Sequence, residues 1–381
     1  MKRVIDSERL PIKLWLDDIE SGALQQAKNL ANLPFAYKWI AIMPDCHQGY
    51  GMPIGGVMAA KDVIVPNAVG VDIGCGMIAS RLTLTDIDEE SLRSILDRLT
   101  AMIPLGFNHH ASPQHWSGFD RAPDIPVVQR ELDSARRQLG TLGGGNHFIE
   151  IQQGDDGHVW LMLHSGSRNF GYKIASEYHR IAKKNSADKN CQLPTSDLAF
   201  LDFESKEGQA YFQAMRFALD FAHASRSAMM NTVKRVVSDF TVAEVDREVN
   251  IHHNYAAVER HFGQDVIVHR KGATKAEKGL QGIIPGSMGT CSYIVEGLGN
   301  PDSFNSCSHG AGRRMGRKRA KKDLDLKEEQ GKMKGIVHGL HSRKGLDEAP
   351  GAYKSIDEVM QAQQDLVKIQ VQLRTLGVLK G

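Results

Sequence analysis

Short apolar runs that end in glycine-rich polar tips recur along this sequence, and they constrain the fold more than any other feature. The runs are KWIAIM before PDCHQGYGMPIGG, DVIVPNAVGV before DIGCGM, HVWLML before HSGSRNFG, and DVIVH before RKGAT. β-Branched residues are enriched before each tip, which is typical of strands. Glycine beside His, Asp and Ser lets a ligand approach the backbone closely. The pattern predicts strands whose tips carry the chemistry of the protein.

Apolar residues at helical spacing lie between these runs. Residues 91–103 follow the acidic DIDEE, residues 207–239 predict one or two long helices, and residues 313–334 begin with the basic RRMGRKRAKK. Strands and helices do not alternate regularly, so we expect an α+β fold with mixed or antiparallel sheets. No repeat or linker divides the sequence, and residues 1–381 are expected to form a single domain.

Charge and composition narrow the function classes. A formal net charge of +2 gives no overall attraction to nucleic acid, so a basic surface must be local, and residues 313–322 are the candidate. The alternative is a solvated helix whose basic and acidic halves offset each other. No apolar run approaches the roughly 20 residues of a membrane span, and no secretory signal is evident, so we expect a cytoplasmic protein without a membrane partner.

Cysteine usage agrees with a reducing compartment. The five cysteines are odd in number and widely spaced (Cys46, Cys75, Cys191, Cys291 and Cys307). A disulfide framework shows an even number at closer, regular spacing. We therefore expect reduced thiols.

Side chains of metal-binding type stand at several of the glycine-rich tips. The set is Asp72, Cys75, His147, His164 and His253. One carboxylate, one thiolate and three imidazoles exceed the needs of one tetrahedral ion, and a thiolate can bridge two ions. Paired CxxC or HxxxH spacing is absent, which favours a catalytic site assembled by the fold over a structural zinc site. The donors leave manganese, zinc and iron open, and each residue alone is equally compatible with a buried core position.

His309 lies in SCSHGAGRRMGR, where small residues surround the imidazole and arginines follow at 313, 314 and 317. Small residues make room for a ligand, and arginine forks suit phosphate oxygens. Other phosphate-compatible side chains stand in HSGSR, RKGAT and IPGSMGTCSY, namely Ser165, Ser167, Arg168, Arg270, Lys271, Ser287 and Ser292. These stretches predict a phosphate-binding site near His309.

The strings DIGCGM, GTLGGGNHFIE, HSGSR, HHNYA, RKGAT, IPGSMGT, SHGAGR and DEAPGAYK together resemble the RtcB RNA ligases, and the likeness extends from residue 43 to the terminal LKG. These enzymes depend on GTP and manganese and join RNA 3′-phosphate or 2′,3′-cyclic phosphate ends to 5′-hydroxyl ends. The resemblance implies an RtcB-like α+β domain with helices and sheets around a deep metal-containing pocket.

The resemblance also implies roles for individual residues. Asp72, Cys75, His147, His164 and His253 resemble the ligands of two Mn²⁺ ions, with Cys75 between them. His309 resembles the nucleophile that takes GMP from GTP, and Asp45 an acidic residue required near the metals. Arg168, Arg313 and Arg317 resemble contacts to phosphate or RNA. The positions that match guanylate contacts are Asn146, Phe148, Glu150, Asn254, Ser287, Ser292, Ala311, Gly312, Tyr353 and Lys380.

The implied partners are RNAs with broken ends, such as tRNA or rRNA fragments, and an archease-like activator. One departure from the family pattern is Cys46, which stands where valine is more usual and is expected to place another thiol near the metals. Two rival interpretations are a cysteine hydrolase that uses Cys75 with His147 and Asn146, and a non-catalytic RNA-binding or RNA-sensing protein on the same fold.

Overall fold

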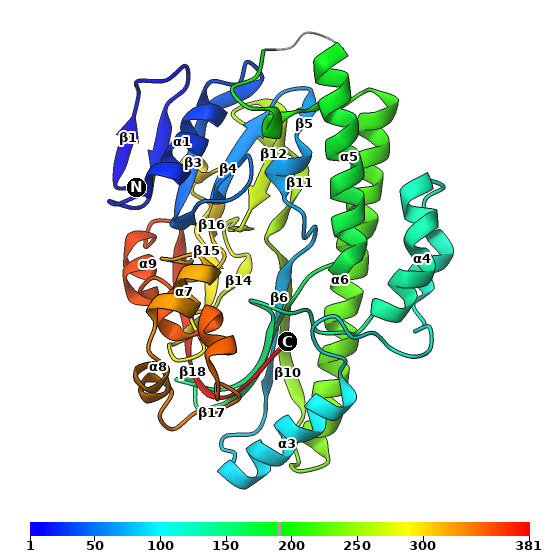
Figure 1. Ribbon diagram of the computed structural model, residues 1–381. Helices are drawn as coiled ribbons and strands as arrows, with labels where there is room; N and C mark the ends of the chain where they lie inside the picture. The colour runs from blue at the N-terminus through cyan, green and yellow to red at the C-terminus, as the bar shows by residue number, and fades with distance from the viewer. Residues whose placement is uncertain (189–191) are drawn as a thin grey trace.

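Two large β-sheets form the framework of the molecule, and two long helices run side by side along one flank (Figure 1). The computed structural model describes residues 1–188 and 192–381, so Cys191 lies outside the described residues. The first sheet has six strands, in the spatial order β1 (Arg3–Ile5), β2 (Ile12–Leu14), β3 (Ala36–His47), β4 (Ile54–Ala60), β12 (Gln264–Lys271) and β11 (Asn254–His261).

The second sheet carries most of the predicted metal ligands at one end of its strands. Its spatial order is β10 (Val245–His252), β6 (Gly76–Leu82), β8 (Val159–Ser165), β7 (Phe148–Gly154), β18 (Val367–Lys380), β15 (Ser292–Gly297) and β14 (Gln281–Ile284), with β17 (Val337–His338) beside β18. Neighbouring strands are antiparallel except for the pairs β2–β3 and β17–β18. Two small sheets pair β13 (Ala273–Lys275) with β16 (Ser306–Ser308) and β5 (Val63–Ile64) with β9 (Leu201–Asp202). The predicted mixed α+β fold is confirmed.

The central strands β6, β7 and β8 of the second sheet are buried on both faces. Ile149, Ile151, Leu161 and Leu163 of β7 and β8 pack in one apolar cluster with residues of α3 (Glu89–Met102) and α6 (Lys206–Ser238). The alternate residues Phe148, Trp160 and Met162 belong to a different cluster. Because both faces are covered, these strands are apolar at successive positions, which is why they stand out in the sequence.

The long helix predicted over 207–239 is a single helix, α6. Its first turn is capped by Ser205, whose hydroxyl accepts a hydrogen bond from the Gly208 N–H. Phe170 of the neighbouring α5 (Arg168–Asp188) packs against Phe217 and Phe221 of α6. The remaining helices are α1 (Ser21–Ala31), α2 (Pro66–Val69), α4 (Pro126–Gln138), α7 (Arg317–Asp323), α8 (Leu326–Lys332) and α9 (Ile356–Ala362), and 3₁₀ turns lie at η1 (Ser117–Arg121), η2 (Ser196–Leu198), η3 (Pro301–Ser303), η4 (Arg343–Glu348) and η5 (Pro350–Ala352). None of the described helices has the length and apolar character needed to cross a bilayer.

Two predictions of local structure were wrong. Residues 313–334 form two short helices, because the chain leaves the helix at Leu324 and the Asp325 carboxylate caps a new one through the N–H groups of Lys327 and Glu328. The run DVIVPNAVGV is not one strand, because Pro66 starts α2 and Gly70 leaves it with φ of 96°. Asp72 and Cys75 therefore precede strand β6 instead of ending a strand.

Candidate metal centre and nucleophile

Strand register brings the predicted ligand segments together at one end of the strands of the second sheet. Gly76 pairs with Ser165 across β6 and β8, and with His252 across β6 and β10. Cys75 therefore lies level with the ends of both neighbouring strands. Phe148 pairs with His164, which places His147 at the same end of the sheet's strands. The ligand segments are distant in the sequence, but the antiparallel pairing makes them neighbours.

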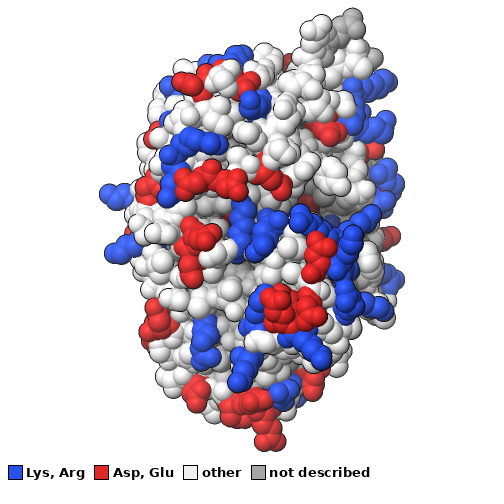
Figure 2. Space-filling view, turned by 60° about the vertical axis from the view of Figure 1, so that its left-hand side comes forward, with Lys and Arg blue, Asp and Glu red and all other residues white. Residues whose placement is uncertain are grey.

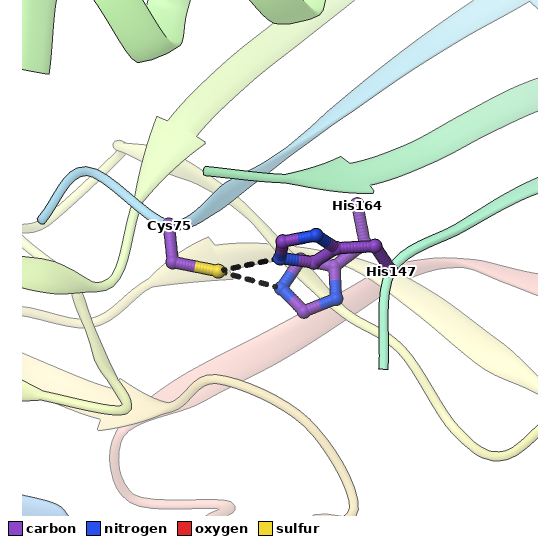
Figure 3. Close-up of side chains that lie close together, drawn as sticks. All are labelled: Cys75, His147 and His164. Carbon is purple, nitrogen blue, oxygen red and sulfur yellow. Dashed lines mark hydrogen bonds between the residues drawn. The ribbon is translucent and has the colours of Figure 1, made fainter. Parts of the chain in front are cut away.

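At these strand ends, imidazole nitrogens of His147 and His164 lie close to the Cys75 thiol (Figure 3). Its Sγ lies 3.5 Å from Nε2 of His147 and 3.3 Å from Nε2 of His164. These three side chains are buried and form a group able to hold a metal ion. Donor atoms that share one tetrahedral ion at 2.0–2.3 Å lie about 3.5 Å apart, so the spacing fits a common cation.

The other two predicted ligands extend this group on opposite sides. Oδ2 of Asp72 lies 3.2 Å from Nε2 of His147. Nε2 of His253 lies 3.3 Å from Nε2 of His164. The thiol of Cys75 thus stands between an Asp–His pair and a His–His pair. This set offers more donor atoms than one tetrahedral cation needs.

Hydrogen bonding and burial prepare these side chains for a cation. Nδ1 of His164 donates to the Asn146 carbonyl oxygen at 2.9 Å, which leaves the lone pair on Nε2 facing Cys75. Burial, followed by the neighbouring His147, holds the pKa of His164 well below its usual value, so the ring is neutral. Burial and then Asp72 raise the pKa of the Cys75 thiol well above its usual value. A thiolate at this place needs a nearby cation to stabilise its charge, and the surrounding donor atoms are placed to bind one.

Some buried polar atoms near these donors have no partner in the part of the protein that the structure describes. Among the described side chains, Nδ1 of His147 and of His253 are buried and have no hydrogen-bond partner within the protein. Oδ1 of Asp45 is in the same condition. Because Nε2 of each ring faces the cluster, Nδ1 lies on the opposite side of the ring and is not the atom that would bind a cation. Among these atoms, Oδ1 of Asp45 is the acceptor that suits a ligand beside His309.

His309 lies directly beside the cluster. It follows strand β16, whose Ser308 pairs with Ala273, and its ring centroid is 4.8 Å from that of His253. Nδ1 of His309 lies 2.6 Å from Oδ2 of Asp45, and the same oxygen accepts the His309 backbone N–H at 3.1 Å. Burial raises the pKa of Asp45, but His309 lowers it further, so the carboxyl is ionised and Nδ1 of His309 donates to it. Nε2 of His309 therefore carries the lone pair, as a nucleophile requires.

Glycine residues allow this approach. Gly312 has φ of 74°, and a Cβ at this position would overlap the backbone of Asp45. A Cβ on Gly272 would contact the His309 ring. The small residues around His309 are therefore explained by close backbone packing.

The residues that resemble guanylate contacts fall into groups. Lys380 pairs with Phe148 across β18 and β7, and its Nζ lies 5.4 Å from the Phe148 ring centroid. Glu150 lies two residues further along β7 and is buried, and burial raises its pKa to about 8. Tyr353 and Arg313 pack together, with the guanidinium 5.1 Å from the ring centroid. Ala311 donates its backbone N–H to the Pro285 carbonyl at 3.0 Å.

Several other predicted side chains make hydrogen bonds inside the protein. The Asn254 amide donates to the Asp72 carbonyl and accepts from the Gly272 N–H, so it links a ligand segment to the backbone beside His309. Ser292 Oγ accepts from Gln152 and from the Gly286 N–H, and Ser287 Oγ contacts Thr290. Arg168 has φ of 59° and donates to Thr141 Oγ1 and the Gly106 carbonyl.

Three sequence-based expectations do not fit the structure. Arg270 is buried and bonds Glu259, Ser306 and the Phe304 carbonyl, and Lys271 donates to backbone carbonyls, so neither presents a free head group for phosphate. The Cys46 side chain packs in an apolar cluster with Ile40 and Ile42, while Asp45 faces His309. Cys46 does not add a thiol to the metal ligands.

Sequence reasoning missed two buried charged residues. Arg226 of α6 donates to the carbonyls of Gly74 and Ser165 and contacts Nδ1 of His252 at 3.0 Å, so it ties together the three segments that carry Cys75, His164 and His253. Its position three and four residues before the buried Met229 and Met230 was the available signal of an inward-facing cation. Glu348 contacts Tyr353 and Lys380, which resemble guanylate contacts, and Arg313 and Arg317, which resemble phosphate or RNA contacts. No comparable signal in the sequence marked it.

The geometry defines a class of protein: one with a buried thiol–imidazole–carboxylate centre beside a histidine whose ring is oriented by a carboxylate. A family model described as tRNA-splicing ligase RtcB matches residues 26–123 and 117–381. The sequence is 40% identical to the RNA-splicing ligase RtcB of Escherichia coli K12 over 405 aligned positions, covering 99% of both chains. It is 34% identical to the tRNA-splicing ligase RtcB of Thermococcus kodakarensis, over 98% of this chain and 95% of that one. It is 32% identical to the RNA-splicing ligase RtcB of Mycobacterium tuberculosis, over 93% and 100%.

The chain belongs to the RtcB family of RNA ligases, enzymes that join RNA 3′-phosphate ends to 5′-hydroxyl ends in tRNA splicing and RNA repair. The cysteine-hydrolase interpretation is wrong in this light. It requires a thiol that reaches substrate, whereas Cys75 is 4% exposed and faces two imidazole nitrogens.

Proposed function

We propose that this ligase works through a covalent GMP–histidine at His309, with GTP as the source of the guanylate. The observation that supports this proposal best is the Asp45–His309 pair, which presents Nε2 of His309 beside the donor cluster. Nε2 attacks the α-phosphorus of GTP, a P–N bond forms, and the bond from the α-phosphorus to the bridging oxygen breaks. Pyrophosphate leaves, and Asp45 stabilises the positive charge that develops on the ring.

We propose that Asp72, Cys75, His147, His164 and His253 would hold two Mn²⁺ ions. The choice of manganese rests on the family resemblance, since the donor set alone also suits zinc and iron. When bound, such ions would supply positive charge that stabilises phosphate oxygens. The protein supplies the fixed donors, the oriented imidazole and the exclusion of water from a buried edge.

The later steps transfer GMP from His309 to an RNA 3′-phosphate, after hydrolysis of any cyclic phosphate, and then let a 5′-hydroxyl displace GMP. Arg168, Arg313 and Arg317 are proposed to contact phosphates in these steps. Broken tRNA or rRNA is the proposed substrate. An archease-like activator, a cytoplasmic location and folding of the whole chain as one domain stay predictions.

The test uses the protein with Mn²⁺ and GTP labelled at the α-phosphate. We expect covalent label that survives alkali and is released by acid, as a phosphoramidate behaves. Addition of RNA with a 3′-phosphate and a second RNA with a 5′-hydroxyl is expected to discharge the label and produce joined RNA. Joined RNA without any labelled protein would overturn the covalent step, and absence of both would overturn the proposal.

The pKa of Glu150 leads to a pH prediction for guanine binding. We propose that its carboxylate accepts hydrogen bonds from the guanine edge, which requires the ionised form. Burial raises its pKa to about 8, although Lys380, Gln152 and Thr375 face it and lower the pKa. The carboxyl is thus mostly protonated at pH 6.5 and mostly ionised at pH 8.5. The affinity for GMP is expected to rise on the order of tenfold between these pH values, and Glu150→Gln should remove the rise in a calorimetric titration.

The helix α7 is the proposed contact surface for RNA. It carries Arg317, Lys318, Arg319, Lys321 and Lys322, all exposed, on the flank that comes forward in Figure 2, where basic side chains gather with acidic ones among them. Binding through phosphates weakens as salt rises. We expect Lys318→Glu with Lys322→Glu to weaken RNA binding about tenfold or more at 0.1 M salt.

The same pair of substitutions is expected to leave labelling by GTP unchanged, because that step needs no RNA. Lys173→Glu with Lys184→Glu on α5 is the matched control, since it reverses two exposed charges on a different helix. Equal RNA affinity in the α7 variant and in this control, measured by fluorescence anisotropy, would exclude α7 as the RNA surface.

A further inference from the structure

A single buried carboxylate joins the residues that resemble nucleotide contacts. Glu348 ends the turn η4 and is 6% exposed. Its Oε1 lies 3.2 Å from Nη1 of Arg313 and 3.6 Å from Nε of Arg317, and its Oε2 lies 3.5 Å from Nζ of Lys380. The Tyr353 hydroxyl also donates to Oε2. These partners come from three separate segments of the chain.

The positive charges around Glu348 outnumber its own negative charge. Burial raises the pKa of this carboxyl, but Lys380, Tyr353 and Arg313 together bring it below the usual value, so Glu348 is ionised. One negative charge faces three cationic side chains. The nearby Asp347 carboxylate pairs with Lys321 at 3.3 Å. The excess of positive charge in this half-buried place suits an anion such as a nucleotide phosphate.

The partners of Glu348 lie on segments next to those that carry His309 and the proposed base-binding residues. Arg313 lies four residues after His309, and its backbone N–H contacts Nδ1 of His47 at 3.5 Å. Lys380 lies opposite Phe148, next to the metal-binding segment at His147. Because side chains with many rotamers lose binding energy when they must be ordered by the ligand, fixing them beforehand favours catalysis.

We propose that Glu348 is a positioning residue for guanylate transfer, whose carboxylate holds Arg313, Tyr353 and Lys380 as one preorganised set around GTP. This inference rests on the proposed function of His309. Glu348 itself acts through its partners and is not assigned a contact with the reacting atoms.

The test compares two buried glutamates of the same region. Glu348→Gln keeps the shape of the side chain and removes its charge. Glu329→Gln is the control, because Glu329 is 1% exposed, accepts from Lys332 and from the Gly351 N–H, and contacts none of the predicted nucleotide residues. We expect Glu348→Gln to slow single-turnover labelling of His309 at saturating GTP about 10- to 100-fold relative to the control. Mn²⁺ affinity should be equal in the two variants.

A double-variant cycle separates positioning from a general loss of structure. Tyr353→Phe removes only the hydroxyl that donates to Glu348, so it should also slow labelling, and combining it with Glu348→Gln should slow labelling no further. The inference is overturned if Glu348→Gln is labelled at the control rate. It is also overturned if the double variant slows labelling by the product of the two single fold-changes.

If Glu348→Gln does not fold, Tyr353→Phe alone decides, and a wild-type rate there overturns the inference. A wild-type protein that forms no label overturns the proposed function and this inference with it.

Discussion

His309→Ala is expected to reduce covalent labelling by α-labelled GTP below detection, which is the largest effect predicted for any single side chain. Asp45 fixes the tautomer of His309 and leaves Nε2 as the attacking atom, and alanine offers no replacement nucleophile. The measurement is retained radioactivity after denaturation, with the amount of bound Mn²⁺ determined in parallel. Bound metal should be unchanged, because His309 lies beside the cluster and is not among the five donors.

The control for this result is His115→Ala, which removes an exposed histidine of the segment between α3 and η1. Asp45→Asn adds a second comparison, because the nucleophile remains but its orientation is weakened. We expect that variant to form label more slowly and not to lose it. Full labelling of His309→Ala would mean that another residue carries GMP.

Arg226→Met is expected to lower the affinity for Mn²⁺ about 10- to 100-fold, although Arg226 is not a ligand. Its guanidinium fixes the backbone at Gly74 and Ser165 and the ring of His252, each adjacent in sequence to a proposed ligand. Methionine leaves these acceptors buried without a donor, so the free energy of unfolding should also fall by roughly 3 kcal/mol or more. Calorimetric titration with Mn²⁺ and chemical denaturation measure the two effects.

Arg270→Met separates loss of metal binding from loss of stability. Arg270 is equally buried but is held by Glu259 and Ser306, so its loss should destabilise the fold without changing the affinity for Mn²⁺ of the folded protein. Arg226→Lys retains the charge and should recover part of the affinity. Equal affinity in Arg226→Met and Arg270→Met would contradict the proposed role of Arg226.

Local patterns in the sequence were sufficient to predict several of the strands, the long helix and the segments that carry the converging side chains. His147 and His164 were expected beside the strands FIEI and VWLML, and the structure places them there, because apolar β-branched runs and glycine tips are local signals. The boundaries around Asp72 were wrong because Pro66 and Gly70 outweigh the apolar character of the surrounding residues. Their ligand roles stay predictions until metal is measured.

Contacts between distant segments were beyond the sequence. The partners of Arg226 lie 24 to 152 residues away, and nothing in the run AHASRSAMM specifies them. The same applies to Glu348, whose link to Lys380 depends on how strand β18 crosses the sheet. The pattern that predicts a strand says nothing of which carboxylate its last side chain will meet.

A bulge in strand β18 sets the position of the last residues of the chain. Thr375 pairs with Gln152, and Gly377 pairs with Ile151, so Leu376 is an extra, bulged residue that shifts everything after it by one position. Without that shift Lys380 would no longer lie opposite Phe148, and its side chain would project from the other face of the sheet. A one-residue deletion between the bulge and Lys380, at Val378 or Leu379, would thus move Lys380 opposite Ile149 and remove an ammonium group from the proposed nucleotide site as surely as a substitution of the lysine itself.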